Sequence, residues 1–176
     1  MAAINVHQTT LAYENSYIFV SNVRIPPVFF RDPNIAQRIY QFVNQEYYPN
    51  EVTPQFEITA AYTLIHRESA ARRKWVGSFS PQQNFSLTSM HLFKDTFFQV
   101  ITPLLDIGHL SRQIDQLVPN TDWTLDEVEA LIVNVSAVVP SNYPRLVQRG
   151  LISQYAGGGG GRGSRRQRKV KSFDLP

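Results

Sequence analysis

The sequence contains no cysteine, which excludes a disulfide scaffold, a thiol nucleophile and any cysteine-ligated zinc or iron–sulfur site. It also lacks a run of the roughly 18 consecutive apolar residues that a membrane-spanning helix needs. Its first residues, MAAINVHQTTLAYENS, have no basic region followed by an apolar core, so they do not match a secretory signal. From these absences we expect an intracellular protein of the cytoplasm or nucleus, with no membrane partner.

Catalytic and metal-binding motifs are also missing. The four histidines, His7, His66, His91 and His109, fall in separate segments. His91 and Asp95 are four residues apart on a predicted helix, but no third ligand follows at a spacing that suits a metal ion. There is no nucleophile-elbow motif and no glycine-rich loop between a strand and a helix. We therefore predict a protein that is not an enzyme and has no cofactor and no metal.

The 176 residues are enough for one domain with a sizeable core, and 43% apolar and 12% aromatic residues are typical of a globular chain. One boundary is clear, after Tyr155, where alanine and five consecutive glycines begin a segment with little to bury. Glycine loses the most conformational freedom on ordering, and few apolar residues here offset that loss. The sequence predicts a globular body, 1–155, and a disordered Gly/Arg-rich basic tail, 156–176.

Alternating apolar and polar residues predict strands in the first part of the body. Residues 3–30 have an extended pattern that Pro26-Pro27 interrupts. Residues 55–66 and the run Trp75, Gly77, Phe79 alternate again, which predicts a hairpin around a loop near residues 68–73.

Helical spacing of apolar residues marks four further segments. The last begins with the capping-box pattern Thr124-Leu125-Asp126-Glu127, and its carboxylates would stabilise a helix N-terminus. The β-branched run 132–135 makes a strand possible there, but we predict a helix. The fold class is therefore α+β, with N-terminal strands and a β-hairpin packed with three to four helices. The predicted helices cover residues 33–47, with Asp32 as the N-cap and Pro33 at the first helical position, 87–104, 107–117 and 124–135.

Positive charge is concentrated in the tail, which has six cations and one acidic residue, while the body has 11 basic and 13 acidic side chains. Lysine and arginine neutralise phosphates, arginine also stacks on bases, and glycine lets the backbone follow an irregular single strand. The tail resembles the arginine–glycine arms of RNA-binding proteins and the basic arms of viral coat and nucleocapsid proteins. A nuclear-localisation address over residues 165–171 and a solubilising tail remain alternatives. The candidate nucleic-acid-binding residues of the tail are Arg162, Arg165, Arg166, Arg168, Lys169 and Lys171.

A second basic cluster lies near the tip of the predicted hairpin. Arg72, Arg73 and Lys74 precede Trp75, and Arg67 is close by in sequence. Adjacent cations followed by an aromatic ring can hold a phosphate and stack a base. The alternative is a solvated turn with Trp75 facing the core. If the cluster binds nucleic acid, we expect it to form one surface with the tail.

Adjacent aromatic residues at Phe29-Phe30, Tyr47-Tyr48 and Phe97-Phe98 exceed what one face of an element can bury. The extra rings would pack against other subunits in an assembly, or form the edge of the core in a monomer. The segment Gln41-Phe42, followed by Glu46-Tyr47-Tyr48-Pro49, is loosely similar to a stretch in rod-shaped plant virus coat proteins. That family is all-helical, and the strands predicted here depart from it.

Together these patterns predict a non-enzymatic nucleic-acid-binding protein, with single-stranded RNA favoured over DNA. A self-assembling viral structural protein, such as a coat or nucleocapsid-like homo-oligomer, is the version that we favour. The alternative is a protein-interaction or regulatory module whose basic tail is only a nuclear-localisation signal.

Overall fold

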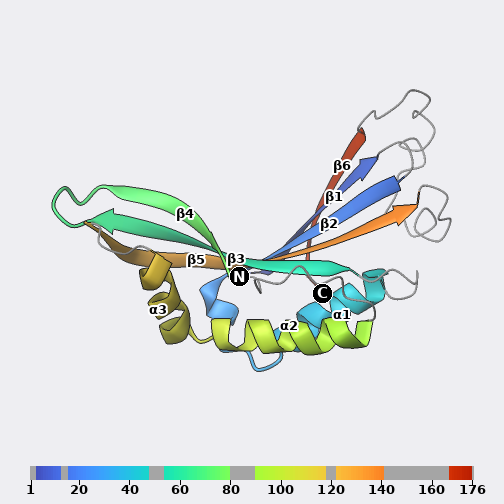
Figure 1. The fold of residues 1–176 in the computed structure, drawn as a ribbon, viewed down its shortest axis with the longest axis horizontal. Coiled ribbons are helices and arrows are strands. Elements are labelled where there is room, and N and C mark those ends of the chain that lie inside the picture. The colour runs from blue at the N-terminus through green and yellow to red at the C-terminus, as the bar shows by residue number, and fades with distance from the viewer. Residues whose placement is uncertain are drawn as a thin grey trace.

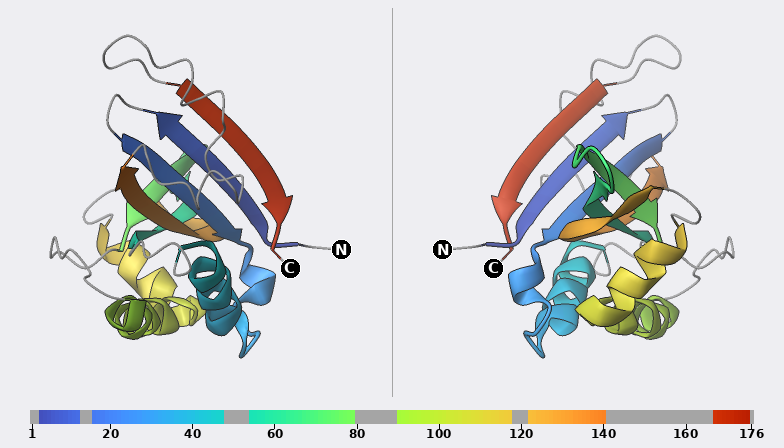
Figure 2. Two further views of the ribbon diagram at one scale, coloured as in Figure 1. Left: turned by 90° about the vertical axis from the view of Figure 1, so that its right-hand side faces the viewer. Right: turned by 90° about the vertical axis from the view of Figure 1, so that its left-hand side faces the viewer.

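A computed structural model describes residues 3–12, 16–47, 54–79, 90–117, 122–140 and 167–175. Six strands form one antiparallel, strongly twisted sheet in the order β4-β3-β5-β2-β1-β6, and the helices cover one of its faces (Figure 1, Figure 2). The predicted α+β class is thus confirmed. The strands are β1 (Asn5–Ala12), β2 (Ser16–Ile25), β3 (Gln55–His66), β4 (Arg72–Ser78), β5 (Trp123–Pro140) and β6 (Gln167–Asp174). The helices are the 3-10 turn η1 (Pro27–Phe29), α1 (Ile35–Tyr47), α2 (Met90–Leu104) and α3 (Ile107–Leu117).

The core lies between the sheet and the helices. Val6, Val23, Val133 and Ile58 are neighbours in one row across four strands, and all four side chains are fully buried. Their alternation with polar residues directs one face of each strand to the helices, as a half-buried sheet requires. The opposite, open face of the sheet has no helix on it among the described elements (Figure 2). No helix in the described part of the chain is long and apolar enough to cross a membrane.

The predicted hairpin is confirmed as β3 and β4, and β1 and β2 form a second antiparallel pair within the segment predicted to be extended. Three of the four predicted helices are present as α1, α2 and α3. α1 begins at Ile35 rather than at Pro33, because Asp32 and Pro33 form a turn before it. In that turn the Asp32 carboxylate accepts a hydrogen bond from the amide of Asn34 at 2.9 Å.

The fourth predicted helix, residues 124–135, is wrong. This segment belongs to β5, the 18-residue strand that pairs with β2 on one side and β3 on the other. β-Branched residues at 132, 133 and 135 favour an extended chain, and Val133 and Val135 are fully buried in the core. In the centre of the sheet β5 forms hydrogen bonds with β2 on one side and β3 on the other, so the extended conformation is more favourable here than a helix.

Two irregularities in β5 explain why the apolar residues of its first half have a helix-like spacing. The pairing register with β3 shifts twice, and Asp126 and Glu129 are the extra residues. A bulge adds one residue to one strand, so the core-facing positions become three apart instead of two. Leu125, Val128 and Leu131 therefore all lie opposite buried residues of β3, at a spacing that is also typical of a helix.

The end of the tail is a strand, where we predicted disorder. β6 pairs with β1 over its whole length, at the edge of the sheet, and the Leu175 amide donates to the Ile4 carbonyl at 2.7 Å. Leu175 is 8% exposed and the Phe173 ring lies 5.9 Å from that of Phe42 in α1. Burial of these two apolar residues and the hydrogen bonds to β1 together favour the ordered strand. Residues 156–166 and Pro176, the rest of the predicted tail, lie outside the described part of the chain.

Candidate nucleic-acid interface

The two basic segments lie at opposite edges of the sheet. β4 contains Arg72, Arg73 and Lys74, and β6 contains Arg168, Lys169 and Lys171. Five strand spacings of about 4.8 Å lie between these edges, so the two segments are at least about 24 Å apart across the sheet, and the strand registers also offset them along the strands (Figure 1). The hairpin and the tail therefore do not form the single surface that we expected.

Strand geometry divides the hairpin candidates between the two faces of the sheet. Arg72 and Lys74 pair with Ile65 and Thr63 on the open face. Arg73 and Trp75 pair with the buried residues Leu64 and Tyr62, so they lie on the helix-covered side. Successive side chains of a strand point to opposite faces. The three adjacent cations consequently do not converge on one phosphate.

The cations of the open face have acidic partners. Arg72 Nε lies 3.0 Å from the Asp126 carboxylate, and Lys74 Nζ lies 3.8 Å from Glu129. Glu129 also forms an ion pair with Arg24 at 3.6 Å and accepts a hydrogen bond from the Thr63 hydroxyl at 3.1 Å. Asp126 and Glu129 thus neutralise basic side chains of neighbouring strands, rather than stabilising a helix N-terminus as we predicted. A phosphate would compete with these carboxylates for Arg72 and Lys74.

On the other side of the hairpin, one cation, Arg73, lies among aromatic rings without such compensation. The Arg73 guanidinium lies over the Trp123 ring, 5.2 Å from its centroid, and His66 meets the same ring edge-on at 5.0 Å. Trp75 is 47% exposed. Among the described residues, no carboxylate forms an ion pair with Arg73. We name these four residues, His66, Arg73, Trp75 and Trp123, the hairpin cluster.

This arrangement suits a base next to a phosphate. An exposed tryptophan offers a flat apolar surface for stacking, and an arginine already packed on an aromatic ring presents its remaining N–H groups in a fixed direction. Trp123 was absent from the predicted site. No sequence signal could have included it, because only the pairing of β3 with β5, His66 opposite Trp123, brings it to the hairpin.

The tail candidates are only partly described. Arg168 and Lys169 occupy β6 positions opposite Leu11 and Thr10 of β1. Lys171 is exposed, and its ammonium lies 5.4 Å from the centroid of the Phe173 ring. The other three, Arg162, Arg165 and Arg166, lie outside the described residues.

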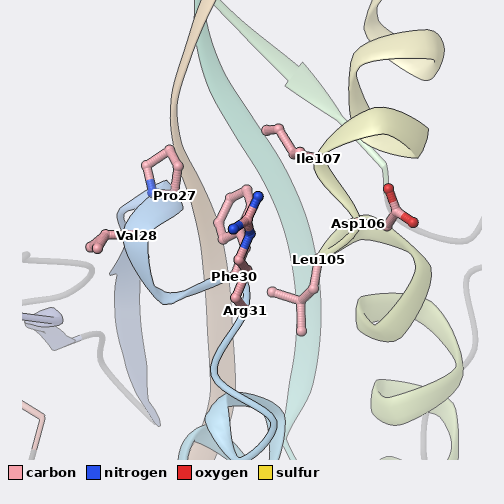
Figure 3. Close-up of a pocket in the computed structure, with 7 residues that line it drawn as sticks. All are labelled: Pro27, Val28, Phe30, Arg31, Leu105, Asp106 and Ile107. Atoms are coloured by element: carbon pink, nitrogen blue, oxygen red, sulfur yellow. The ribbon is translucent and has the colours of Figure 1, made fainter.

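An open groove of about 710 Å³ lies between η1 and the connection from α2 to α3 (Figure 3). Its lining is mostly apolar, and its two charged residues are Arg31 and Asp106. The Asp106 carboxylate already accepts a hydrogen bond from the His109 amide at 3.1 Å, as a cap of α3. The groove therefore offers no acid–base pair. Nor does the described part of the chain contain a group of three or more His, Asp or Glu side chains that could hold a metal ion.

The adjacent aromatic residues do not form an exposed patch. Phe30 and Phe97 are buried, while their neighbours Phe29 and Phe98 are half-buried and pack against the core. Tyr48 lies outside the described residues. In these two pairs the second ring lies at the edge of the core, which agrees better with the core-edge interpretation than with subunit contacts.

No family model, curated protein or solved structure matches this chain. The similarity to rod-shaped plant virus coat proteins does not extend to the fold, because a six-stranded sheet forms the centre of this molecule.

Proposed function

We propose that this protein binds single-stranded nucleic acid, RNA in preference to DNA, through the hairpin cluster and the tail cations. The observation that supports this proposal most is the packing of Arg73 on Trp123 beside the half-exposed Trp75, with no acidic partner for Arg73 among the described residues. A cation that serves only to keep the surface soluble needs no such arrangement.

The two parts of the interface have different roles. Trp75 stacks a base, which contributes about 1–3 kcal/mol per base in such sites, and Arg73 contacts the adjacent phosphate. The tail cations add affinity without base specificity by releasing condensed counterions. The hairpin thus holds the strand locally, while the tail supplies the salt-dependent attraction.

Removal of the tail is a poor test, because it also removes Phe173 and Leu175 from the core. Replacing only the tail cations by a neutral residue leaves Phe173 and Leu175 in place. In the tail-neutral variant all six tail cations become glutamine, and binding of a labelled 20-nucleotide RNA is measured across a salt series. If all six engage phosphates, the log–log salt slope of the native chain is about −4, from about −0.7 per contact, and it flattens sharply in the variant.

The hairpin provides a matched pair of variants. Arg73→Gln and Arg72→Gln remove the same charge from adjacent positions, but only Arg73 belongs to the hairpin cluster. We expect Arg73→Gln and Trp75→Ala each to weaken RNA binding by about tenfold, as the loss of a stacking or charged contact does. Arg72→Gln should weaken it less than twofold, because Asp126 already neutralises Arg72. Equal losses for Arg72→Gln and Arg73→Gln would show that only net charge matters, and unchanged binding in every variant would contradict the proposal.

The alternative of a nuclear-localisation address makes a different prediction, namely altered location with unchanged RNA binding. One observation disfavours it. Residues 167–174 are paired with β1 over the whole length of β6, whereas an address must be accessible to its receptor.

A further inference from the structure

β6 is attached to the rest of the fold by few elements. All eight of its residues pair with β1, its Phe173 ring packs beside that of Phe42 in α1, and its Ser172 hydroxyl lies next to His7 of β1. The His7 Nδ1 and the Ser172 hydroxyl lie 2.7 Å apart. Every one of these contacts can be made equally well by a β6 strand from another copy of the chain.

The connection to β6 does not restrict it to its own sheet. β5 ends at Pro140, opposite Ser16, and β6 begins at Gln167, opposite Ala12, so both ends lie at the same end of the sheet. Three strand spacings, about 14 Å, separate these ends. The 26 residues 141–166 can span up to about 85 Å when extended. The connection is therefore long enough to place β6 on the β1 edge of a neighbouring molecule.

We propose that copies bound next to one another on a nucleic-acid strand exchange β6, so that β6 of one copy pairs with β1 of the next. This inference rests on the proposed function. Within one chain, the covalent connection of 26 residues gives β6 an effective concentration in the millimolar range at its own β1 edge, which favours the closed monomer in dilute solution. Side-by-side binding on one RNA raises the local concentration of neighbouring β1 edges to a similar level.

Charge gives a reason for the exchange to depend on RNA. Both edge strands, β4 and β6, are basic, and like charges on edges oppose association of sheets in free solution. A bound polyanion neutralises the β6 cations and removes this repulsion. Because each copy gives one strand and receives one, the exchange produces either closed pairs or an open chain along the RNA.

The absence of cysteine makes a direct test possible. His7→Cys and Ser172→Cys place two thiols on directly paired residues, and Cβ atoms of such pairs lie about 4.5–5.5 Å apart, close to what a disulfide needs. In the double variant, a disulfide within one chain in dilute, RNA-free solution verifies the pairing. The two single variants are then mixed at 10 µM, with and without a 60-nucleotide RNA, and oxidised. A disulfide between them in excess of random collision requires β6 of one chain to reach β1 of the other.

We expect the mixed disulfide dimer to appear with RNA, and to be at least tenfold less abundant without it. Ser78→Cys, on the opposite edge, replaces Ser172→Cys as the control for random collision. RNA binding is measured in the same samples. Bound protein that yields no more mixed dimer than the control overturns the exchange and leaves the proposed function intact. If the protein does not bind RNA, the proposed function fails; mixed dimer above the control at millimolar protein would then support exchange, and its absence would overturn it.

Discussion

The two edges of the sheet are alike in charge but differ in how they join the fold. β4 follows β3 after a short turn, residues 67–71, and its side chains from Arg72 to Val76 are all exposed. β6 is separated from β5 by 26 residues, and Phe173 of β6 and the following Leu175 pack in the core. A basic segment can thus be a surface strand held by a local hairpin, or a distant strand held by its apolar residues.

Electrostatic compensation differs as well. Arg72 and Lys74 of β4 meet carboxylates of β5, whereas β1, the neighbour of β6, contains no acidic residue. Among the described residues Lys171 forms no ion pair, and its ammonium lies over the Phe173 ring. The β4 edge is therefore partly neutralised by the fold, while Lys171 at the β6 edge is not.

The largest expected effect on the free energy of unfolding concerns how much each edge strand contributes to the core. Leu175→Ala removes a buried side chain and should lower the free energy of unfolding by about 2–4 kcal/mol. Val76→Ala removes a β4 side chain that is 65% exposed and should change it by less than about 0.5 kcal/mol. Urea unfolding of both variants measures the difference. Similar losses in the two variants would mean that the edges are anchored alike.

An intermediate effect concerns the support beneath β2 and β1. The buried Tyr47 hydroxyl of α1 shares a hydrogen bond of 3.1 Å with the Ser21 hydroxyl of β2, which also accepts from Gln8 of β1. Tyr47→Phe should cost about 1 kcal/mol at pH 7, the net value of a typical hydrogen bond.

The same residue predicts a pH dependence. Burial raises the pKa of Tyr47 well above its ordinary range, so the folded state keeps the proton that the unfolded state loses. Stability is therefore complete below about pH 10, the ordinary tyrosine value, and falls above it by up to about 1.4 kcal/mol per pH unit. Urea unfolding between pH 8 and 11 should show a shallower fall in Tyr47→Phe. Parallel curves for the native chain and the variant would rule out Tyr47 as the source.

The smallest expected effect concerns the neutralised edge. Arg72→Ala removes an exposed ion pair with Asp126 and should lower the free energy of unfolding by about 0.2–1 kcal/mol in low salt. In 1 M salt, where the screening length is about 3 Å, the difference should nearly vanish. A loss that persists in high salt would indicate that the arginine contributes by packing rather than by charge.

The alternation and spacing of apolar residues were enough to predict the β3–β4 hairpin and the helices α1, α2 and α3, because those elements form from local patterns. β5 could not be assigned in this way. Its bulges at Asp126 and Glu129 turn a period of two into a period of three, and only pairing with β3 makes those bulges favourable.

The candidate site was predicted in part. Arg73 and Trp75 were correctly placed on the hairpin, but their separation from Arg72 and Lys74 depends on which face each residue of β4 occupies. Trp123 is 50 residues from Arg73 in sequence and joins it only through the register of β3 and β5.

By itself the sequence determined the α+β class, the local elements and the concentration of positive charge near the C-terminus, since each of these depends on composition or on neighbours along the chain. Only the tertiary structure decided that β5 is a central strand, that residues 167–174 close one edge of the sheet, and that the two basic segments lie at opposite edges. Strand pairing joins residues that are far apart in sequence, and its free energy depends on the partner strand rather than on the segment alone.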